Sequence, residues 1–221
     1  PMRRTPRFAA ASDNSFDGLV GVGVAYRLAQ ALLRTHHQMP VTDREVSLQE
    51  EDLLDLVALG TVADLAPLRG QNRSLVRRGL EKLNETGRPG IQALCRQARL
   101  TRGAVDSTAI GYVLGPRLNA AGRLAHARSA YDLLVTSDPV EAQSLAVALD
   151  SLNRERQQLT REAHERARQM VLETKDDGLV LFAASPEFLS GIVGLVASRL
   201  LDEFYRPSVV VKLGERVSHG S

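Results

Sequence analysis

The chain of 221 residues contains no tryptophan, a single cysteine and only 4% aromatic residues. One cysteine excludes a disulfide framework and a zinc site built from cysteines within this sequence. Cys95 lies in a helical pattern, and we predict that it is a small residue of the core. Apolar residues still make up 43% of the chain, so the core has to be built from leucine, valine and alanine, as in helix-rich proteins.

Long hydrophobic runs are absent as well. No apolar stretch approaches the ~20 residues that a membrane-spanning helix needs. Arg3, Arg4 and Arg7 are followed by no apolar segment, which argues against a secretory signal peptide in this sequence. The sequence therefore predicts a cytoplasmic protein without a membrane partner.

Lysine is scarce among the charged residues. Of the 28 basic residues, all are arginine except Lys82, Lys175 and Lys212, and the net charge is +2. Arginine holds phosphate better than lysine because its planar guanidinium offers a fork of donors. A biased genomic base composition produces the same preference, so charge alone does not identify a nucleic-acid-binding protein.

Helical spacing of apolar residues dominates the first part of the chain. A helix is predicted from Gly21 to near His36-His37, with one apolar face made of Val24, Ala25, Leu28, Ala29, Leu32 and Leu33. Adjacent helical residues point ~100° apart, and no third ligand lies nearby, so we favour a solvated helix end over a metal site for the two histidines. A second helix, 49–59, is acidic in its first turn and apolar nearly all round, which predicts that it is buried. Further helices are predicted over 72–83, 89–100, 106–114 and 129–135.

The longest predicted helix starts at Ser137-Asp138-Pro139, where a capping residue precedes a proline in the first turn. Nothing interrupts it before about Thr174, which gives a length of roughly 50 Å. Its apolar residues form a narrow stripe: Leu145, Leu149, Leu152, Leu159, Ala163, Ala167 and Met170. Such a stripe suits a strut between domains or a coiled-coil seam, and we favour the strut because the chain then changes architecture.

The last part of the chain reads as strand, helix, strand over 179–184, 189–204 and 207–213. A βαβ unit of this kind pairs its strands in parallel with a right-handed crossover. Gly191 and Gly194 are expected to let the helix pack close to the sheet. Two strands do not make a stable parallel sheet, so the final domain is expected to be truncated.

Asp64 is a candidate functional residue because it closes the buried apolar helix 49–59 and the Gly60–Ala63 segment after it. A charge in such surroundings is costly unless a partner compensates it. Two interpretations stay open: an aspartate that caps the next helix, or a metal ligand.

A second candidate is the segment Leu114–Arg123. Gly115-Pro116 is predicted to end the preceding helix, while Asn119 and Gly122 tolerate unusual backbone conformations. Arg117 and Arg123 would leave this bend as two cations, each able to hold a phosphate. The alternative is a helix-to-helix turn with solvated arginines.

Five motifs, in this order, carry a family resemblance: Gly21–Ala29, Asp55–Asp64, Gly115–Arg123, Leu152–Arg156 and Gly191–Leu200. In this set the chain resembles the RecJ exonucleases, which belong to the DHH phosphoesterase superfamily. The resemblance extends from Gly18 to the last residue. Each motif alone is weak, but five in the right order, with the long helix between them, are specific.

The resemblance implies an α/β protein in three parts. Residues 1–136 are expected to be the helix-rich C-terminal part of a DHH catalytic domain, 137–175 the long connecting helix, and 176–221 the truncated βαβ start of a DHH-associated domain. The family hydrolyses single-stranded DNA from the 5′ end in DNA repair and recombination. It uses two Mn²⁺ or Mg²⁺ ions held by aspartates and histidines, ligands that suit these metals. The expected partner is single-stranded DNA with a 5′ end, besides a single-strand-binding protein or a helicase.

Residue roles also follow from the resemblance. Asp64 matches the last metal-binding aspartate of the family. Arg117, Asn119 and Arg123 match the asparagine-arginine motif beside the bound strand, and Arg123 is expected to contact a phosphate near the metals. Gly220-Ser221 resembles the first half of the glycine-serine-arginine-serine loop that grips the 5′ phosphate.

The chain departs from the family pattern at two places. The Asp-His-His motif and the earlier aspartate motifs are missing and are expected before Pro1, so this chain alone, without most metal ligands, is expected to be inactive. Phe188-Leu189 stands where many members carry tryptophan and histidine, which puts a base-stacking or polar role there in doubt.

Two alternatives remain open. The first is a catalytically dead relative that serves as a DNA-binding or replication scaffold. The second is a member acting on short oligonucleotides or cyclic dinucleotides, although such members usually lack the long helix and the Leu152–Arg156 motif.

Overall fold

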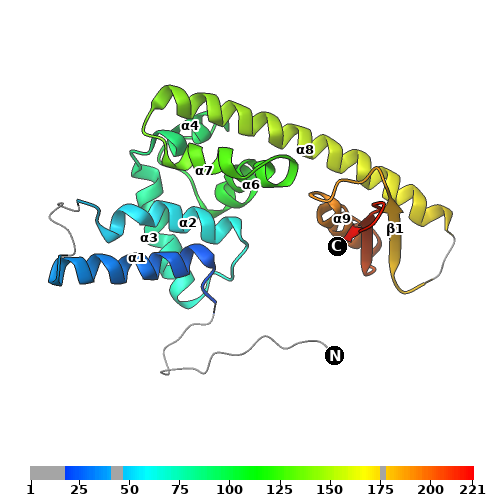
Figure 1. The fold of residues 1–221 in the computed structure, drawn as a ribbon, viewed down its shortest axis with the longest axis horizontal. Coiled ribbons are helices and arrows are strands. Elements are labelled where there is room, and N and C mark those ends of the chain that lie inside the picture. Colours follow the sequence, from blue (N-terminus) through cyan, green and yellow to red (C-terminus); the bar gives the residue numbers. More distant parts are fainter. Residues whose placement is uncertain (1–17, 41–46, 175–177) are drawn as a thin grey trace. The chain divides into compact units, whose positions relative to one another are not determined.

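The computed structural model describes residues 18–40, 47–174 and 178–221 (Figure 1). The chain forms two compact units, one from Pro1–Thr86 and Arg102–Gly111, the other from Gly87–Thr101 and Tyr112–Ser221. The predicted domain boundaries near 136 and 175 stay a prediction. None of the helices within the described residues is long and apolar enough to cross a membrane.

The first unit is helical. Its described elements are α1 (Gly21–Gln38), the 3₁₀ turn η1 (Glu50–Leu53), α2 (Leu54–Ala63), α3 (Gly70–Glu85) and the short α5 (Ser107–Ala109). Helix α2 is buried on nearly every side, as its apolar sequence predicts. It packs closely on α3 because Gly79 has no side chain; a Cβ there would overlap the backbone carbonyl oxygen of Leu54.

The predicted apolar face of α1 is right at Leu33 and wrong at Val24, Leu28 and Leu32. The helix buries Gly23, Tyr26, Gln30 and Leu33, whereas Val24, Leu28 and Leu32 are exposed by 57%, 62% and 62%. Tyr26 packs with Leu54, Val57 and Leu75 in the core of this unit. The helix is therefore turned about its axis from the position that apolar periodicity predicts.

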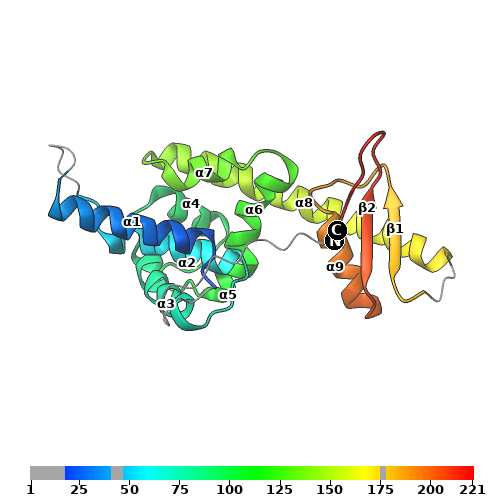
Figure 2. The ribbon, with the colours of Figure 1, turned by 60° about the horizontal axis from the view of Figure 1, so that its bottom comes forward.

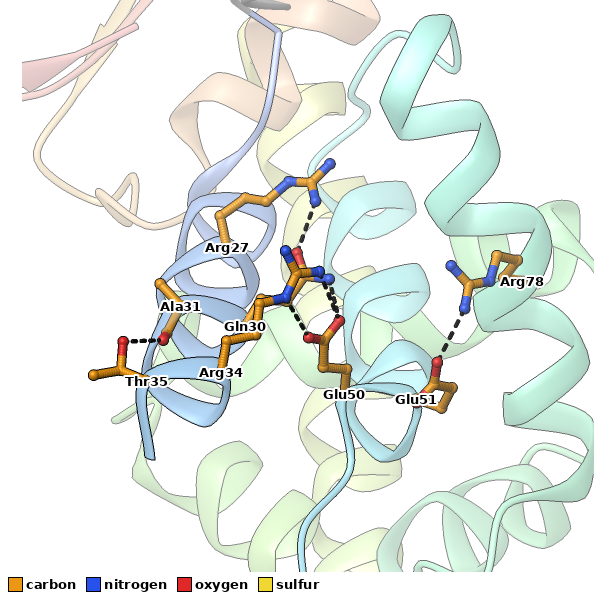
Figure 3. A network of polar contacts seen from close by, with 8 residues as sticks. All are labelled: Arg27, Gln30, Ala31, Arg34, Thr35, Glu50, Glu51 and Arg78. Carbon is orange, nitrogen blue, oxygen red and sulfur yellow. Dashed lines mark hydrogen bonds and ion pairs between the residues drawn. The ribbon is translucent and has the colours of Figure 1, made fainter. Parts of the chain in front are cut away.

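A polar network lies beside this buried face (Figure 3). Gln30 and Arg34 both donate hydrogen bonds to the carboxylate of Glu50, over 2.6 and 2.9 Å. On the other side of η1, Arg78 pairs with Glu51 at 3.4 Å. The bonds from Arg34 and then Gln30 lower the pKa of Glu50. Gln30 thus lies on the buried side of α1 and is bonded to Glu50 there.

The second unit is built along one long helix. Its elements are α4 (Pro89–Gln97), α6 (Gly115–Leu124), α7 (Arg128–Val135), α8 (Pro139–Glu173), β1 (Leu181–Ser185), α9 (Val193–Phe204), β2 (Ser208–Lys212) and β3 (His219–Gly220). Helices α4, α6 and α7 pack on α8, and so do α9 and β1 (Figure 1). The predicted start of α8 is confirmed, since the Asp138 side chain accepts a hydrogen bond from the Val140 amide.

The buried side of α8 differs from the predicted stripe. Leu149 and Ala167 of that stripe are buried, and the other buried residues are small or polar: Ala142, Ala146, Asp150, Asn153 and Thr160. Leu145 and Leu152 are only half-buried. The alanines let neighbouring helices approach closely, and Asp150 is buried because cations from other parts of the unit compensate its charge.

The βαβ unit is confirmed (Figure 2). Strands β1 and β2 pair in parallel, with Leu181 opposite Ser208, and α9 connects them. The sequence did not predict β3, which pairs antiparallel to β2. Phe188 is 2% exposed and lies in the core of this part with Val196 and Leu200, so it is a packing residue. Cys95, on α4, is half-buried, and burial raises the pKa of its thiol.

Candidate nucleic-acid interface

The Leu114–Arg123 segment is helical, so the predicted break is wrong. The π-helical turn η2 (Ile110–Leu114) continues directly into α6, which begins at Gly115. Pro116 is the second residue of α6 and, having no N–H, donates no backbone hydrogen bond back to the preceding turn. Asn119 and Gly122 lie within α6, and neither is among the described residues with positive φ.

Asn119 and Arg123 share one exposed face of α6, because they are four residues apart on the helix. Arg123 donates a hydrogen bond from Nη1 to the carbonyl oxygen of Gly191, over 3.1 Å. A Cβ at Gly191 would overlap the backbone carbonyl of Arg123. Gly191 thus packs against the end of α6, whereas the sequence predicted contact with the sheet.

Arg117 points away from that face. Its Nε donates to Asp150 Oδ1 over 2.9 Å, and its Nη1 donates to the Val113 carbonyl over 2.7 Å. The side chain is 18% exposed. Asp150 on α8 also accepts hydrogen bonds from Arg154 and Gln97. Arg117 therefore fastens α6 to α8 through a buried carboxylate.

The charge of Asp150 is stabilised in spite of its burial. Burial alone raises the pKa of an aspartate. Here the hydrogen bond from Gln97 and the charges of Arg117 and Arg154 outweigh this effect, and the pKa of Asp150 is lowered. Asp150 is therefore ionised at neutral pH and holds the Arg117 side chain in one position.

Gly220 and Ser221 lie at the edge strand of the sheet. The Ser221 amide and carbonyl both bond to Val210 on β2, over 3.0 and 2.9 Å. The Ser221 Oγ lies 3.1 Å from the position that a Cβ at Gly194 would occupy. Gly194 belongs to the first turn of α9, whose N-cap, Ile192, offers no side-chain acceptor or donor. Gly194, in the first turn of α9, therefore lies against Ser221, and Gly191, just before α9, lies against the Arg123 carbonyl.

Asp64 belongs to the first unit, whereas Arg123 and Ser221 belong to the second. It is the exposed C-cap of α2. It does not cap the next helix, since the N-cap of α3 is Arg69. The buried aspartate of α2 is Asp55, which accepts a hydrogen bond of 2.8 Å from the Thr86 hydroxyl. The buried carboxylate of α2 is thus that of Asp55, whereas Asp64 is exposed and its charge bears no burial cost.

A metal centre needs several ligands close together. Across residues 18–40, 47–174 and 178–221, no three histidine, cysteine, aspartate or glutamate side chains are placed to hold one ion. Asp64 offers a single exposed carboxylate. The described residues by themselves therefore do not fit a two-ion centre.

No protein-family model matches the chain. Curated proteins do: it is 40% identical over 200 residues to the single-stranded-DNA-specific exonuclease RecJ of Bacillus subtilis, covering 90% of this chain and 24% of that protein. It is 38% identical over 205 residues to RecJ of Escherichia coli, covering 86% and 34%. RecJ of Thermus thermophilus in complex with Mg²⁺ superposes with a TM-score of 0.75 at 33% identity, over 90% of this chain and 30% of that one. The chain is similar to the RecJ exonucleases over about 90% of its length. The resemblance and the α/β fold that it implied are confirmed.

A second RecJ structure, bound to manganese, matches with a TM-score of 0.74 at 33% identity, over 90% of this chain and 48% of that chain. The chain spans only about a quarter to a third of the curated RecJ proteins named above. Sequence reasoning gave no role to Arg156 and Arg199, although both lie in motifs shared with RecJ. The signal in the sequence was the presence of arginine at both positions.

Proposed function

We propose that the protein containing this chain is a RecJ-type exonuclease that hydrolyses single-stranded DNA from the 5′ end, with Mn²⁺ or Mg²⁺, in DNA repair and recombination. The observation that carries the proposal is the match in sequence and fold over about 90% of the chain to RecJ proteins. Solved relatives contain Mg²⁺ or manganese. The cytoplasm is the proposed location, and a single-strand-binding protein or a helicase a proposed partner.

Each site residue has a part in this proposal. Asp64 supplies one carboxylate ligand, and the remaining ligands have to come from outside the described residues. Asn119 and Arg123 contact the DNA backbone from the exposed face of α6. Gly220-Ser221 receives the 5′ phosphate at the start of α9. Arg117, which matches the same motif, is bonded to Asp150 and Val113 and is proposed to position α6.

Arg123 is the residue proposed to act on the reacting phosphate. Its hydrogen bond to the Gly191 carbonyl fixes the guanidinium while other N–H groups stay available. A donor that is already in position stabilises developing negative charge without the cost of reorganisation. The geometry of α6 and the turn before α9 supports this role, because both are packed backbone to backbone.

The test uses the full-length protein and 3′-labelled single-stranded DNA with Mn²⁺. We expect stepwise shortening from the 5′ end. Asp64→Asn should abolish hydrolysis and largely spare DNA binding, because one metal ligand is lost and the phosphate contacts remain. Hydrolysis by Asp64→Asn at the wild-type rate would contradict its role. Binding without hydrolysis by the wild type would favour a scaffold protein instead. The isolated 221-residue chain is expected to be inactive.

A further inference from the structure

Arg156 on α8 has an unfilled hydrogen-bond donor. The side chain is half-buried, and its Nη2 donates to Asn153 Oδ1 over 3.0 Å. Its Nε is buried and has no hydrogen-bond partner among the described residues. Buried guanidinium N–H groups are normally paired, since an unpaired one has lost its water without compensation. The site around Nε is therefore incomplete without an acceptor.

Two further arginines lie on helices that pack against α8, Arg123 on α6 and Arg199 on α9. Burial lowers the pKa of Arg156, and the charges of Arg123 on α6 and Arg199 on α9 lower it further. No acidic group acts on Arg156, and none of the three arginines forms an ion pair within the described residues. Three uncompensated cations from three helices repel one another and stabilise any anion that enters between them.

We propose that Arg123, Arg156 and Arg199 form one anion site that binds a phosphate group of single-stranded nucleic acid, with the Nε–H of Arg156 donated to a phosphate oxygen. Phosphate fits because it accepts several N–H bonds at once and matches the fork of a guanidinium. The inference rests on the proposed function for the identity of the ligand. It extends the interface from α6 to α8 and α9 and assigns two residues that were without a role.

The site predicts how DNA binding depends on salt. Full-length protein in EDTA, which prevents hydrolysis, is titrated with fluorescent oligothymidylate over a series of salt concentrations. Neutralising one phosphate of a single strand contributes ~0.7 to the slope of log K against log salt. Arg156→Gln should lower the slope by about this amount and weaken binding at low salt on the order of 10-fold. Arg156→Lys should keep the slope and lose part of the affinity, because it keeps the charge and lacks the fork.

The matched control is Arg161→Gln. Arg161 is an exposed arginine of the same helix without an ion pair or hydrogen bond in the described part of the chain. It should change neither slope nor affinity measurably. The affinity of Arg156→Gln is also compared for oligonucleotides with a 5′ phosphate and with a 5′ hydroxyl. An equal loss of affinity for both strands assigns the site to an internal phosphate. A loss of affinity only for the phosphorylated strand assigns it to the terminal phosphate.

A second measurement separates an anion site from a structural role. Inorganic phosphate should raise the Tm of the wild type and of Arg161→Gln but not that of Arg156→Gln. Without phosphate, Arg156→Gln should be at least as stable as the wild type, because repulsion and the unpaired Nε–H are removed. A lower Tm together with an unchanged salt slope would show that Arg156 only braces Asn153 and would overturn the proposal.

The outcomes for the anion site and for the exonuclease are distinguishable. If Arg156→Gln lowers the salt slope while the wild type hydrolyses no DNA, the anion site stands and the exonuclease proposal fails. If the wild type hydrolyses DNA and Arg156→Gln binds with the wild-type slope, the anion site is refuted and the exonuclease stands.

Discussion

Replacing Asp150 by asparagine tests the tie between α6 and α8. The Asp150 side chain is 3% exposed and receives hydrogen bonds from Arg117, Arg154 and Gln97. Asparagine has the same size and no charge, so the buried guanidinium of Arg117 loses its counter-charge. Removing one partner of a buried ion pair costs ~3–5 kcal/mol. Arg154 is 73% exposed, and water replaces its lost partner at a cost of less than ~1 kcal/mol.

The assay is urea denaturation at neutral pH, followed by circular dichroism. We expect Asp150→Asn to lower the free energy of unfolding by ~3 kcal/mol or more. Arg154→Gln, which removes the exposed partner of the same carboxylate, should lower it by less than ~1 kcal/mol. The double variant Asp150→Leu/Arg117→Met removes both charges and should recover most of the loss. A loss below ~1 kcal/mol for Asp150→Asn would refute the reasoning that Arg117 depends on this carboxylate.

The same residue predicts a pH dependence. The pKa of Asp150 is lower in the folded protein than the ordinary aspartate value of about 4. The folded state therefore binds fewer protons than the unfolded state in this range. The stabilisation that the ionised Asp150 contributes is complete above the ordinary aspartate pKa. It is lost as the pH falls through the lower folded pKa. The difference in unfolding free energy between the wild type and Asp150→Asn should narrow in that acidic range and stay constant from about pH 5 upward.

Three further variants follow from the packing and the site. Arg123→Ala should raise the activation free energy of DNA hydrolysis by ~2–4 kcal/mol, the usual effect of losing one prepositioned donor; unchanged kcat/KM would refute the role. Gly79→Ala should destabilise the protein by ~1–3 kcal/mol or more, because its Cβ overlaps the Leu54 carbonyl, while Gly87→Ala, with nothing within 4 Å, should change stability by less than ~0.5 kcal/mol. Gly191→Ala should weaken DNA binding in an anisotropy titration, because it displaces the backbone at Arg123; wild-type affinity would contradict the contact.

Local signals in the sequence predicted the elements whose cause is local. Asp138 and Pro139 mark the start of α8, and no residue interrupts it until the end that was expected. The strands of the βαβ unit were predicted because buried parallel strands are apolar runs. β3 was missed because a strand of two residues, His219–Gly220, shows no alternation.

Elements governed by distant contacts were predicted wrongly. Apolar periodicity in α1 favours Val24 and Leu28, but both are exposed, whereas the polar Gln30 is buried and bonds to Glu50, 20 residues further along the chain. Proline at 116 suggested a helix end, and the π-helical turn before it lets the helix continue.

The candidate site shows the same limit. Its segment was recognised from motifs, but Arg117 and Arg123 could not be distinguished by sequence. Only the position of Asp150, 33 residues from Arg117, shows which arginine is fastened inside and which stays exposed. The exposure of Asp64 depends on how α2 packs and was equally invisible.

The contact between Gly191 and the Arg123 carbonyl has a mechanical consequence. Most helix contacts are made through side chains, which absorb a small displacement by changing rotamer. Here two stretches of main chain touch directly, and no rotamer is available to take up a shift. A shift of the main chain at Gly191 would therefore displace the main chain at Arg123, at the end of α6, with it.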